Sequence, residues 1–281
     1  MLGINKGRIS AMLVEKCDYR PWDARQKLKL CMRILIILVV SAITTLATIQ
    51  SAWAGPPFIT DDPEPLEPQH WEINYAISKS WRQGEASAAI PNIDINYGAA
   101  PNIQLHIQPR YSYERTATDT HFGIDDTEVG IKYRFINIQH EDFSFMVGTY
   151  PMLQLPTGDT KLGTNRNKVQ SFLPLWLQAK SDKWTIYGGM GYRINPGTDN
   201  KNSLFLGITT LYEISPKLQL GGEIFHESPN TEGGVDSSGF NLGGSFNLFH
   251  DHNILFAVGK GLKNASSTNQ LSVYLAFQAL Y

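Results

Sequence analysis

The chain has 281 residues, of which 42% are apolar, 18% charged and 11% aromatic. A membrane protein built from several helices needs repeated apolar runs of about 20 residues. Only residues 32–47 come near such a run, so the composition excludes that class. The 24 glycines and 15 prolines are too few for a disordered or collagen-like chain. We therefore expect a folded protein of one large domain or two small ones.

Residues 1–54 have the features of a secretory signal. Basic residues between positions 27 and 33 precede an apolar run at 34–40, and Ala52-Trp53-Ala54 follows it. This order is typical of a signal peptide that is cleaved after export. Cleavage after Ala54 would leave 227 residues. The true start is either Met1, with an extended basic region, or Met32.

The charge and the cysteines change when this segment is removed. Residues 1–54 carry 8 Lys/Arg and 3 Asp/Glu, which leaves 16 basic and 23 acidic residues and a net charge of −7. This balance argues against nucleic acid as a partner. Cys17 and Cys31 both precede the cleavage site, so we expect neither disulfides nor thiolate metal sites in the exported chain.

From residue 70 to residue 281, apolar and polar side chains alternate with the two-residue period of a strand that has two different faces. Trp71, Ile73, Tyr75 and Ile77, for example, alternate with polar or small residues. Twelve strands are predicted. The first four begin near residues 71, 92, 103 and 128, and the others lie near 143–155, 169–179, 184–194, 203–214, 218–226, 239–248, 254–261 and 270–281.

The predicted connections alternate in length, at about 8, 5, 12, 6, 13, 4, 8, 3, 12, 5 and 8 residues, with boundaries uncertain by two or three. Barrels of the bacterial outer membrane have tight periplasmic turns and longer extracellular loops. The expected tight turns contain reversal-prone Asn, Asp, Pro, Ser and Gly. They are Gly98–Asn102, Asn137–Asp142, Lys180–Lys183, Ser215–Lys217 and Phe249–Asn253.

Aromatic residues are placed at the ends of the predicted strands, as in the two interfacial girdles of such barrels. Trp71, Tyr97, Phe135, Phe143, Trp184 and Tyr281 fall at one set of ends, and Trp81, Tyr113 and Tyr192 at the other. The last strand alternates through Phe277 to the terminal Tyr281, which resembles the signal that the outer-membrane insertion machinery recognises.

These patterns predict an all-β fold, a 12-stranded antiparallel up-and-down transmembrane β-barrel over residues 70–281. Unpaired backbone groups in hydrocarbon cost several kcal/mol each, so a sheet in lipid must close on itself. Residues 55–69, rich in proline and acidic side chains, are expected to be a periplasmic lead-in to the first strand. We favour a linker for this segment over a partial plug of the lumen.

Six segments of the chain match the pattern of a known family in order and spacing. Each match is weak alone, and the set becomes specific only when the six are taken together. They are residues 55–65, 70–72, 126–135, 155–159, 184–192 and 221–226. Together they resemble a bacterial family called putative MetA-pathway of phenol degradation, although Asp125 stands where that family has glycine. The resemblance implies an outer-membrane barrel associated with the uptake of aromatic or other hydrophobic compounds.

The inward face of the barrel is expected to carry both signs of charge. The candidate lumen residues are Glu72, Asp94, Arg110, Glu114, Glu128, Lys132, Arg134, Arg193, Glu213 and Glu223. They either pair across strands to brace the wall, or Arg110, Lys132 and Arg134 face acids and set a transverse field at a constriction. Less polar residues share this face: Met146, Tyr150, Met152, Phe172, Trp176, Tyr187 and Phe225. Such a lumen suits a small aromatic solute better than a bare ion, although core filling explains these residues almost as well.

The loop motif Leu155-Pro156-Thr157-Gly158-Asp159 precedes the longest predicted loop, and its Pro and Gly fit a turn that folds the loop inward or sideways. It lacks the lysine and serine spacing of a phosphate-binding loop. His250-Asp251-His252 is weak evidence for a metal site. We therefore expect no metal and no cofactor.

The predicted function is a channel for the passive passage of small hydrophobic or aromatic compounds across the outer membrane, with lipid, the insertion machinery and such a solute as partners. The first alternative is a non-conducting barrel whose loops near 115–126, 156–168 and 227–238 bind a partner. The second is an outer-membrane lipid hydrolase, which needs a Ser–His pair. His106 and Ser112 share a face but lie roughly 20 Å apart along the strand, so we expect no enzyme.

Overall fold

The computed structural model describes residues 56–159, 162 and 168–281. The predicted signal peptide, its cleavage site and both candidate start residues lie outside this part of the chain. No helix within the described residues is long and apolar enough to cross a membrane. The described residues form antiparallel strands with one short helix, α2, at Ala265–Thr268.

Fifteen strands are present. The first eight are β1 Trp71–Arg82, β2 Glu85–Ala100, β3 Ile103–Gln108, β4 Arg110–Arg115, β5 Thr120–Ile124, β6 Thr127–Gln139, β7 Ser144–Thr149 and β8 Met152–Leu155. The other seven are β9 Gln170–Ser181, β10 Trp184–Ile194, β11 Ser203–Ser215, β12 Leu218–Glu227, β13 Ser237–Phe249, β14 His252–Lys263 and β15 Leu271–Leu280.

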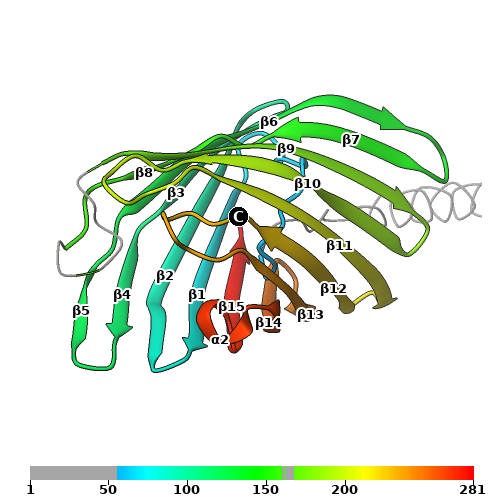
Figure 1. The fold of residues 1–281 in the computed structure, drawn as a ribbon. Coiled ribbons are helices and arrows are strands. Elements are labelled where there is room, and N and C mark those ends of the chain that lie inside the picture. The colour runs from blue at the N-terminus through cyan, green and yellow to red at the C-terminus, as the bar shows by residue number, and fades with distance from the viewer. Residues whose placement is uncertain (1–55, 160–161, 163–167) are drawn as a thin grey trace, which may run out of the picture. The chain divides into compact units, whose positions relative to one another are not determined.

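The fifteen strands make a closed barrel of twelve. Three barrel strands are interrupted once each, at Pro109 between β3 and β4, at residues 125–126 between β5 and β6, and at residues 150–151 between β7 and β8. Every neighbouring pair is antiparallel, and β1 pairs with both β2 and β15. Figure 1 shows the strands curving round a common interior, with β15 next to β1. The predicted twelve-stranded barrel is confirmed.

The two faces of the sheet differ as the alternation predicts. Large apolar side chains such as Ile77, Leu175, Ile208 and Leu275 are exposed on the outer face, each by more than 40%. A closed barrel with such a face leaves no backbone group unpaired in hydrocarbon, which is what a lipid bilayer requires. The protein is therefore a bacterial outer-membrane β-barrel.

Aromatic pairs mark the ends of the strands, in agreement with the predicted girdles. The rings of Trp71 and Tyr97 lie 4.4 Å apart, and those of Trp184 and Tyr212 lie 4.6 Å apart. The terminal Tyr281 completes the seam, because its backbone N–H donates to the carbonyl of Trp71 and its carbonyl accepts from the N–H of Trp71.

Two predicted long connections are wrong. β1 and β2 are joined by residues 83–84 alone, and β4 and β5 by residues 116–119. Gly84, at φ 77°, supplies the left-handed conformation of the first turn. The strict alternation of long and short connections therefore holds only from the loop at 156–169 onward. The prediction missed the beginning of β2 because residues 85–89 are mostly Ala and Ser, which show no alternation of large apolar and polar side chains.

The predicted linker is also wrong. Residues 56–69, here called the strap, lie against the inner wall of the barrel, where Thr60 and Asp62 have no exposed surface. At the C-terminal end of the strap, next to β1, the N–H of Gln69 donates to the carbonyl of Gly98 on β2. The structure agrees with the alternative, a partial plug, because acidic side chains of the strap contact basic and polar side chains of the inner wall.

Candidate functional site

Lys132 on β6 holds the middle of the strap. Its Nζ donates to Asp61 Oδ1 at 3.0 Å and lies 3.6 Å from Asp62 Oδ2. Burial raises the pKa of the Asp62 carboxyl to about 8, and the Lys132 charge opposes that rise. The buried lysine thus faces two carboxylates that are supplied by the strap and not by the wall.

A second base, Lys180 on β9, contacts the strap at a residue closer to β1 along the chain. Lys180 Nζ donates to Glu64 Oε2 at 2.6 Å, and Gln178 Nε2 donates to the same oxygen at 2.7 Å. Further along, the backbone N–H of Leu66 donates to Gln104 Oε1 on β3 at 2.9 Å. The strap therefore crosses the interior between strands that lie far apart in the sheet order.

The far end of the strap is held by a carboxylate of the wall. Glu223 on β12 accepts hydrogen bonds from the backbone N–H of Ile59 at 2.9 Å and of Thr60 at 2.8 Å, one on each oxygen. Asn241 on β13 also donates to Glu223. Phe58 packs against Tyr187 and Leu211. Glu223, a predicted lumen residue, thus binds the strap backbone.

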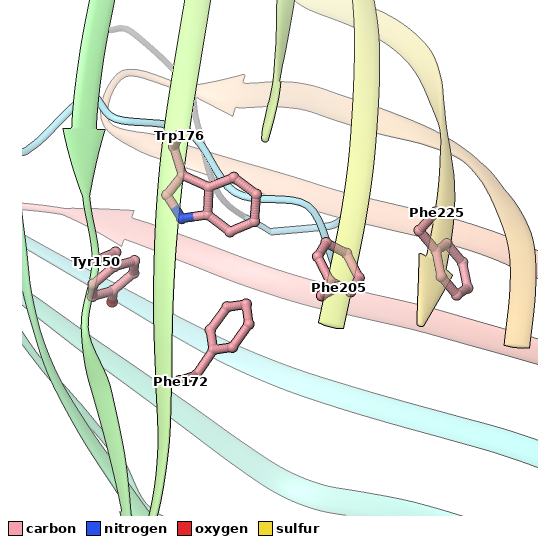
Figure 2. Close-up of a cluster of buried hydrophobic side chains, with 5 residues drawn as sticks. All are labelled: Tyr150, Phe172, Trp176, Phe205 and Phe225. Carbon is pink, nitrogen blue, oxygen red and sulfur yellow. The ribbon is translucent and has the colours of Figure 1, made fainter. Parts of the chain in front are cut away.

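Next to the strap, five aromatic side chains form a cluster on the inner wall, here called the aromatic wall. Its members are Tyr150, Phe172, Trp176, Phe205 and Phe225, each exposed by 7% or less. Figure 2 shows Phe172 and Trp176 on one strand, with Tyr150 to one side of them and Phe205 and Phe225 to the other. Trp176 and Phe172 both have ring centroids about 6.2 Å from that of Phe205, and Phe225 stacks on Phe205 at 6.3 Å.

Two cations lie over rings of this wall. Arg193 Cζ is 4.9 Å from the ring centre of Phe172, and Lys132 Nζ is 5.0 Å from that of Tyr150. Cations at this distance are attracted by the negative face of the ring. The lumen therefore combines aromatic surface with charge, as the sequence predicts.

Three predicted lumen acids, one histidine and one asparagine form a separate network near the first strands. His106 Nδ1 lies 3.0 Å from Asp94 Oδ1, and His106 Nε2 lies 3.5 Å from Glu128 Oε1. Asn74 donates to Glu72 at 2.9 Å and to Asp94 at 3.3 Å. These contacts brace the wall across β1, β2, β3 and β6, which agrees with the structural interpretation of the charges.

The remaining predicted bases have separate partners. Arg110 Nε lies 3.8 Å from Asp125 Oδ2, whereas Arg134 donates through two nitrogens to Asn102 Oδ1 in the turn between β2 and β3. The hypothesis of one transverse field from Arg110, Lys132 and Arg134 therefore finds no support in the contacts. Glu114 and Glu213 face the interior and are partly exposed.

The loop motif folds back onto the barrel. After Leu155 and Pro156, Thr157 Oγ1 donates to Thr127 Oγ1 at 3.0 Å. The N–H of Gly158 donates to Asp126 Oδ1 at 3.0 Å, and that of Asp159 to the carbonyl of Ile124 at 2.7 Å. Leu162, three residues beyond the motif, is buried, with 1% of it exposed. The motif is thus a structural turn that hydrogen bonds hold against the barrel.

A cavity of about 350 Å³ lies beyond the strap. Pro57, Phe58 and Ile59 form one side of it. Small polar residues contribute much of the rest, namely Ser78, Ser80, Ser87, Ser112, Asn241 and Ser272. A cavity of this size can hold a small organic molecule, and three residues of the strap line it.

One Ser–His pair lies on the barrel wall. His226 Nδ1 on β12 and Ser238 Oγ on β13 are hydrogen-bonded at 2.9 Å. His106 and Ser112, which were considered for a hydrolase, have other partners: Ser112 Oγ donates to Asp125, and His106 contacts acids. The carboxylate of Asp236, two residues from Ser238, contacts Lys263 and Asn264. Within the described residues, no three His, Cys, Asp or Glu side chains are grouped as metal ligands.

Sequence reasoning missed three functional features. Phe205 has the same inward parity as Thr209 and Leu211 in β11, so the alternation could have placed it in the aromatic wall. The roles of Gln104 and Lys180 had no local signal, because their partners belong to the strap.

Comparison with known proteins identifies the family of the chain. The family described as Putative MetA-pathway of phenol degradation matches residues 69–278. Comparison with curated protein sequences gives no match. Among solved structures, the KdgM porin has a TM-score of 0.48 at 13% identity, covering 74% of this chain and 98% of its own. The outer membrane phospholipase A from Escherichia coli has a TM-score of 0.42 at 13% identity, covering 81% and 94%.

Proposed function

We propose that this chain, which belongs to the family described as Putative MetA-pathway of phenol degradation, is a channel for the passive passage of small hydrophobic or aromatic solutes across the outer membrane. The aromatic wall carries this proposal. Tyr150, Phe172, Trp176, Phe205 and Phe225 all face the interior, although a barrel in lipid needs large apolar side chains only outside.

Such a wall lowers the cost of moving an aromatic solute through the lumen. A flat ring gains offset or edge-to-face contacts with the side chains of the wall. The charged groups beside the rings, Arg193 and Lys132, keep the space compatible with water. Passage requires contacts strong enough to admit the solute and weak enough to release it. We therefore expect selectivity for a small ring over a polyol of equal size.

Proteoliposomes test this function. Purified protein in vesicles should accelerate the entry of an impermeant aromatic, benzenesulfonate, more than that of a sugar of similar size. Replacing Phe172 and Phe205 together by Ala should lower the ratio of the two rates at least threefold, since both rings belong to the wall. The matched control replaces the exposed outer residues Phe122 and Phe135 by Ala. An unchanged ratio in the first variant would contradict the proposed role of the wall.

A non-conducting surface barrel is the second candidate, and the strap is the observation that favours it. A lumen crossed by buried ion pairs passes no solute while they hold. If vesicles with the full chain and vesicles with strap-deleted protein both exclude benzenesulfonate and sugars, the surface barrel is the better assignment.

The lipid-hydrolase alternative now has a definite residue pair, His226 and Ser238. We propose that this pair is structural, because the nearby Asp236 contacts Lys263 and Asn264. Purified protein should release no fatty acid from phospholipid vesicles. Release that is abolished by Ser238→Ala but kept in Ser228→Ala would instead establish an enzyme.

A further inference from the structure

The strap is attached to the wall by side-chain contacts and not by sheet pairing. No strap residue belongs to a strand. Between residues 59 and 66 its backbone N–H groups donate to Glu223 and Gln104 on the wall and to Asp61 and Asp62 within the strap, all of them side chains. Releasing it would therefore break no strand ladder. The barrel can remain closed whether the strap is bound or not, because β1 pairs with β15 and β2 independently of it.

The inner wall is nevertheless shaped to receive the strap. A Cβ atom added to Gly207 on β11 would overlap the side chain of Thr60, and one added to Gly98 on β2 would overlap the backbone carbonyl of Glu67 in the strap. Real Cβ atoms essentially never come this close to another heavy atom. Glycine at these two positions lets the strap lie flat on the wall, which indicates a specific docked state and not a random collapse.

The charges that hold the docked strap favour reversibility. Lys132 with Asp61 and Asp62, and Lys180 with Glu64, are ion pairs taken out of water. The desolvation of buried ions offsets much of their mutual attraction, so such pairs add little net stability compared with the hydrated groups. When the strap leaves, both lysines and all three carboxylates would regain water in the lumen. The ion pairs thus add little to the free-energy cost of releasing the strap.

We propose that the strap is an internal gate, closed in this structure, and that its release from Lys132, Lys180 and Glu223 opens the lumen. This inference rests on the proposed channel function. Phe58 and Ile59 line the solute-sized cavity, and the acidic strap residues that follow them contact Lys132 and Lys180. Displacement of the strap would remove Phe58 and Ile59 from this cavity and free both lysines without any change in the barrel strands.

A reversible covalent lock tests the gate. Thr60→Cys with Gly207→Cys places two sulfurs where the two side chains would meet, and residues 55–281 contain no native cysteine. In proteoliposomes, oxidation of the double variant should lower benzenesulfonate uptake at least tenfold, and reduction should restore it. Thr60→Cys alone and Gly207→Cys alone are the controls, and neither should respond to oxidant. Because a Cβ atom at position 207 itself presses on Thr60, the oxidised double variant is also compared with Gly207→Cys, in which no cross-link holds the strap against that contact. Because both states are measured on the same folded protein, a folding defect cannot mimic the result.

A second pair of variants should act in the opposite direction. Lys132→Met combined with Lys180→Met removes both bases that bind the strap, and uptake should rise severalfold. The matched control, Lys183→Met, changes an exposed lysine in the turn between β9 and β10 and should leave uptake unchanged.

The outcomes separate the gate from the channel. Equal uptake in the oxidised and reduced double-cysteine protein, with measurable flux in both, overturns the gate and leaves the channel standing. Absence of flux in every variant, the double lysine variant included, overturns both. Loss of flux on oxidation together with a gain in the lysine variant supports both.

Discussion

At the scale of single residues, the inner wall is packed like the core of a soluble protein. Trp176 is 1% exposed and Phe172 7%, and the two lie in one aromatic cluster with Phe205. An inward residue of an open water-filled pore would be bathed in solvent instead. The cluster thus contributes to the stability of the barrel as well as to the surface that a solute meets.

Trp176→Ala should therefore be strongly destabilising. Truncation of a buried Trp costs about 3–5 kcal/mol in well-packed cores, because contacts are lost and a cavity remains. The free energy of unfolding, measured by guanidinium titration in lipid vesicles, should fall by about that amount. Trp184→Ala removes the same side chain from the outer surface, where 49% of it is exposed, and should cost less. Equal losses in the two variants would argue against a packed inner cluster.

Residue identity alone predicted which face a side chain occupies but not which partner it meets. Lys132 was assigned to the lumen from its parity on the strand, and it does lie there. Its partners, Asp61 and Asp62, are about 70 residues away in the chain and belong to no periodic pattern. Long-range polar contacts of this kind leave no mark in local alternation, which is why the strap was misassigned as a linker.

At the scale of secondary-structure elements, the sequence predicted strands well where large apolar residues alternate and poorly where small ones do. β10 and β12 match their predicted bounds within a residue. The first half of β2, in contrast, is rich in Ala and Ser and was assigned to a loop. Interruptions of the strands were not predicted either, because Pro109 and Pro151 are compatible with both a bulge and a continuous barrel strand.

Each strand should show a depth-dependent tolerance to charge on its outer face. In β11, Ile208 lies near the centre and Ile214 near the end, and their exposed fractions are 55% and 52%. Since exposure is matched, a difference between arginine substitutions reports the depth in lipid. Ile208→Arg should cost about 2–4 kcal/mol and Ile214→Arg about 0–1 kcal/mol. The same guanidinium titration in vesicles measures both, and similar costs would indicate that β11 does not cross the bilayer as assigned.

At the scale of the whole molecule, closure is the property on which the fold depends. The first and last strands pair over residues 72–81 and 271–280, so the seam joins the two ends of the barrel domain. A pairing between segments about 200 residues apart must pay a large loop-closure entropy before any contact is gained. The short turns align consecutive hairpins, but only the seam turns the sheet into a barrel with no free edge.

A disulfide across the seam should report this closure directly. Ala76 on β1 and Ala276 on β15 are register partners that are both buried, and residues 55–281 have no cysteine of their own. Paired strand positions lie within the Cα separation that a disulfide spans. Ala76→Cys with Ala276→Cys should therefore oxidise within one chain. The cross-link should raise the free energy of unfolding by about 4 kcal/mol, because it constrains a very long loop of the unfolded chain.

The control for this prediction uses the same two strands in the wrong register. Ser272 pairs with Ser80, four positions along β1 from Ala76, so Ala76→Cys with Ser272→Cys places the sulfurs roughly 13 Å apart. This variant should stay reduced in the folded protein and show no gain in the guanidinium midpoint. If the in-register pair forms only intermolecular disulfides, or if both pairs oxidise equally, then β1 and β15 do not meet in a fixed register. The barrel would then be open along that edge, which lipid does not tolerate.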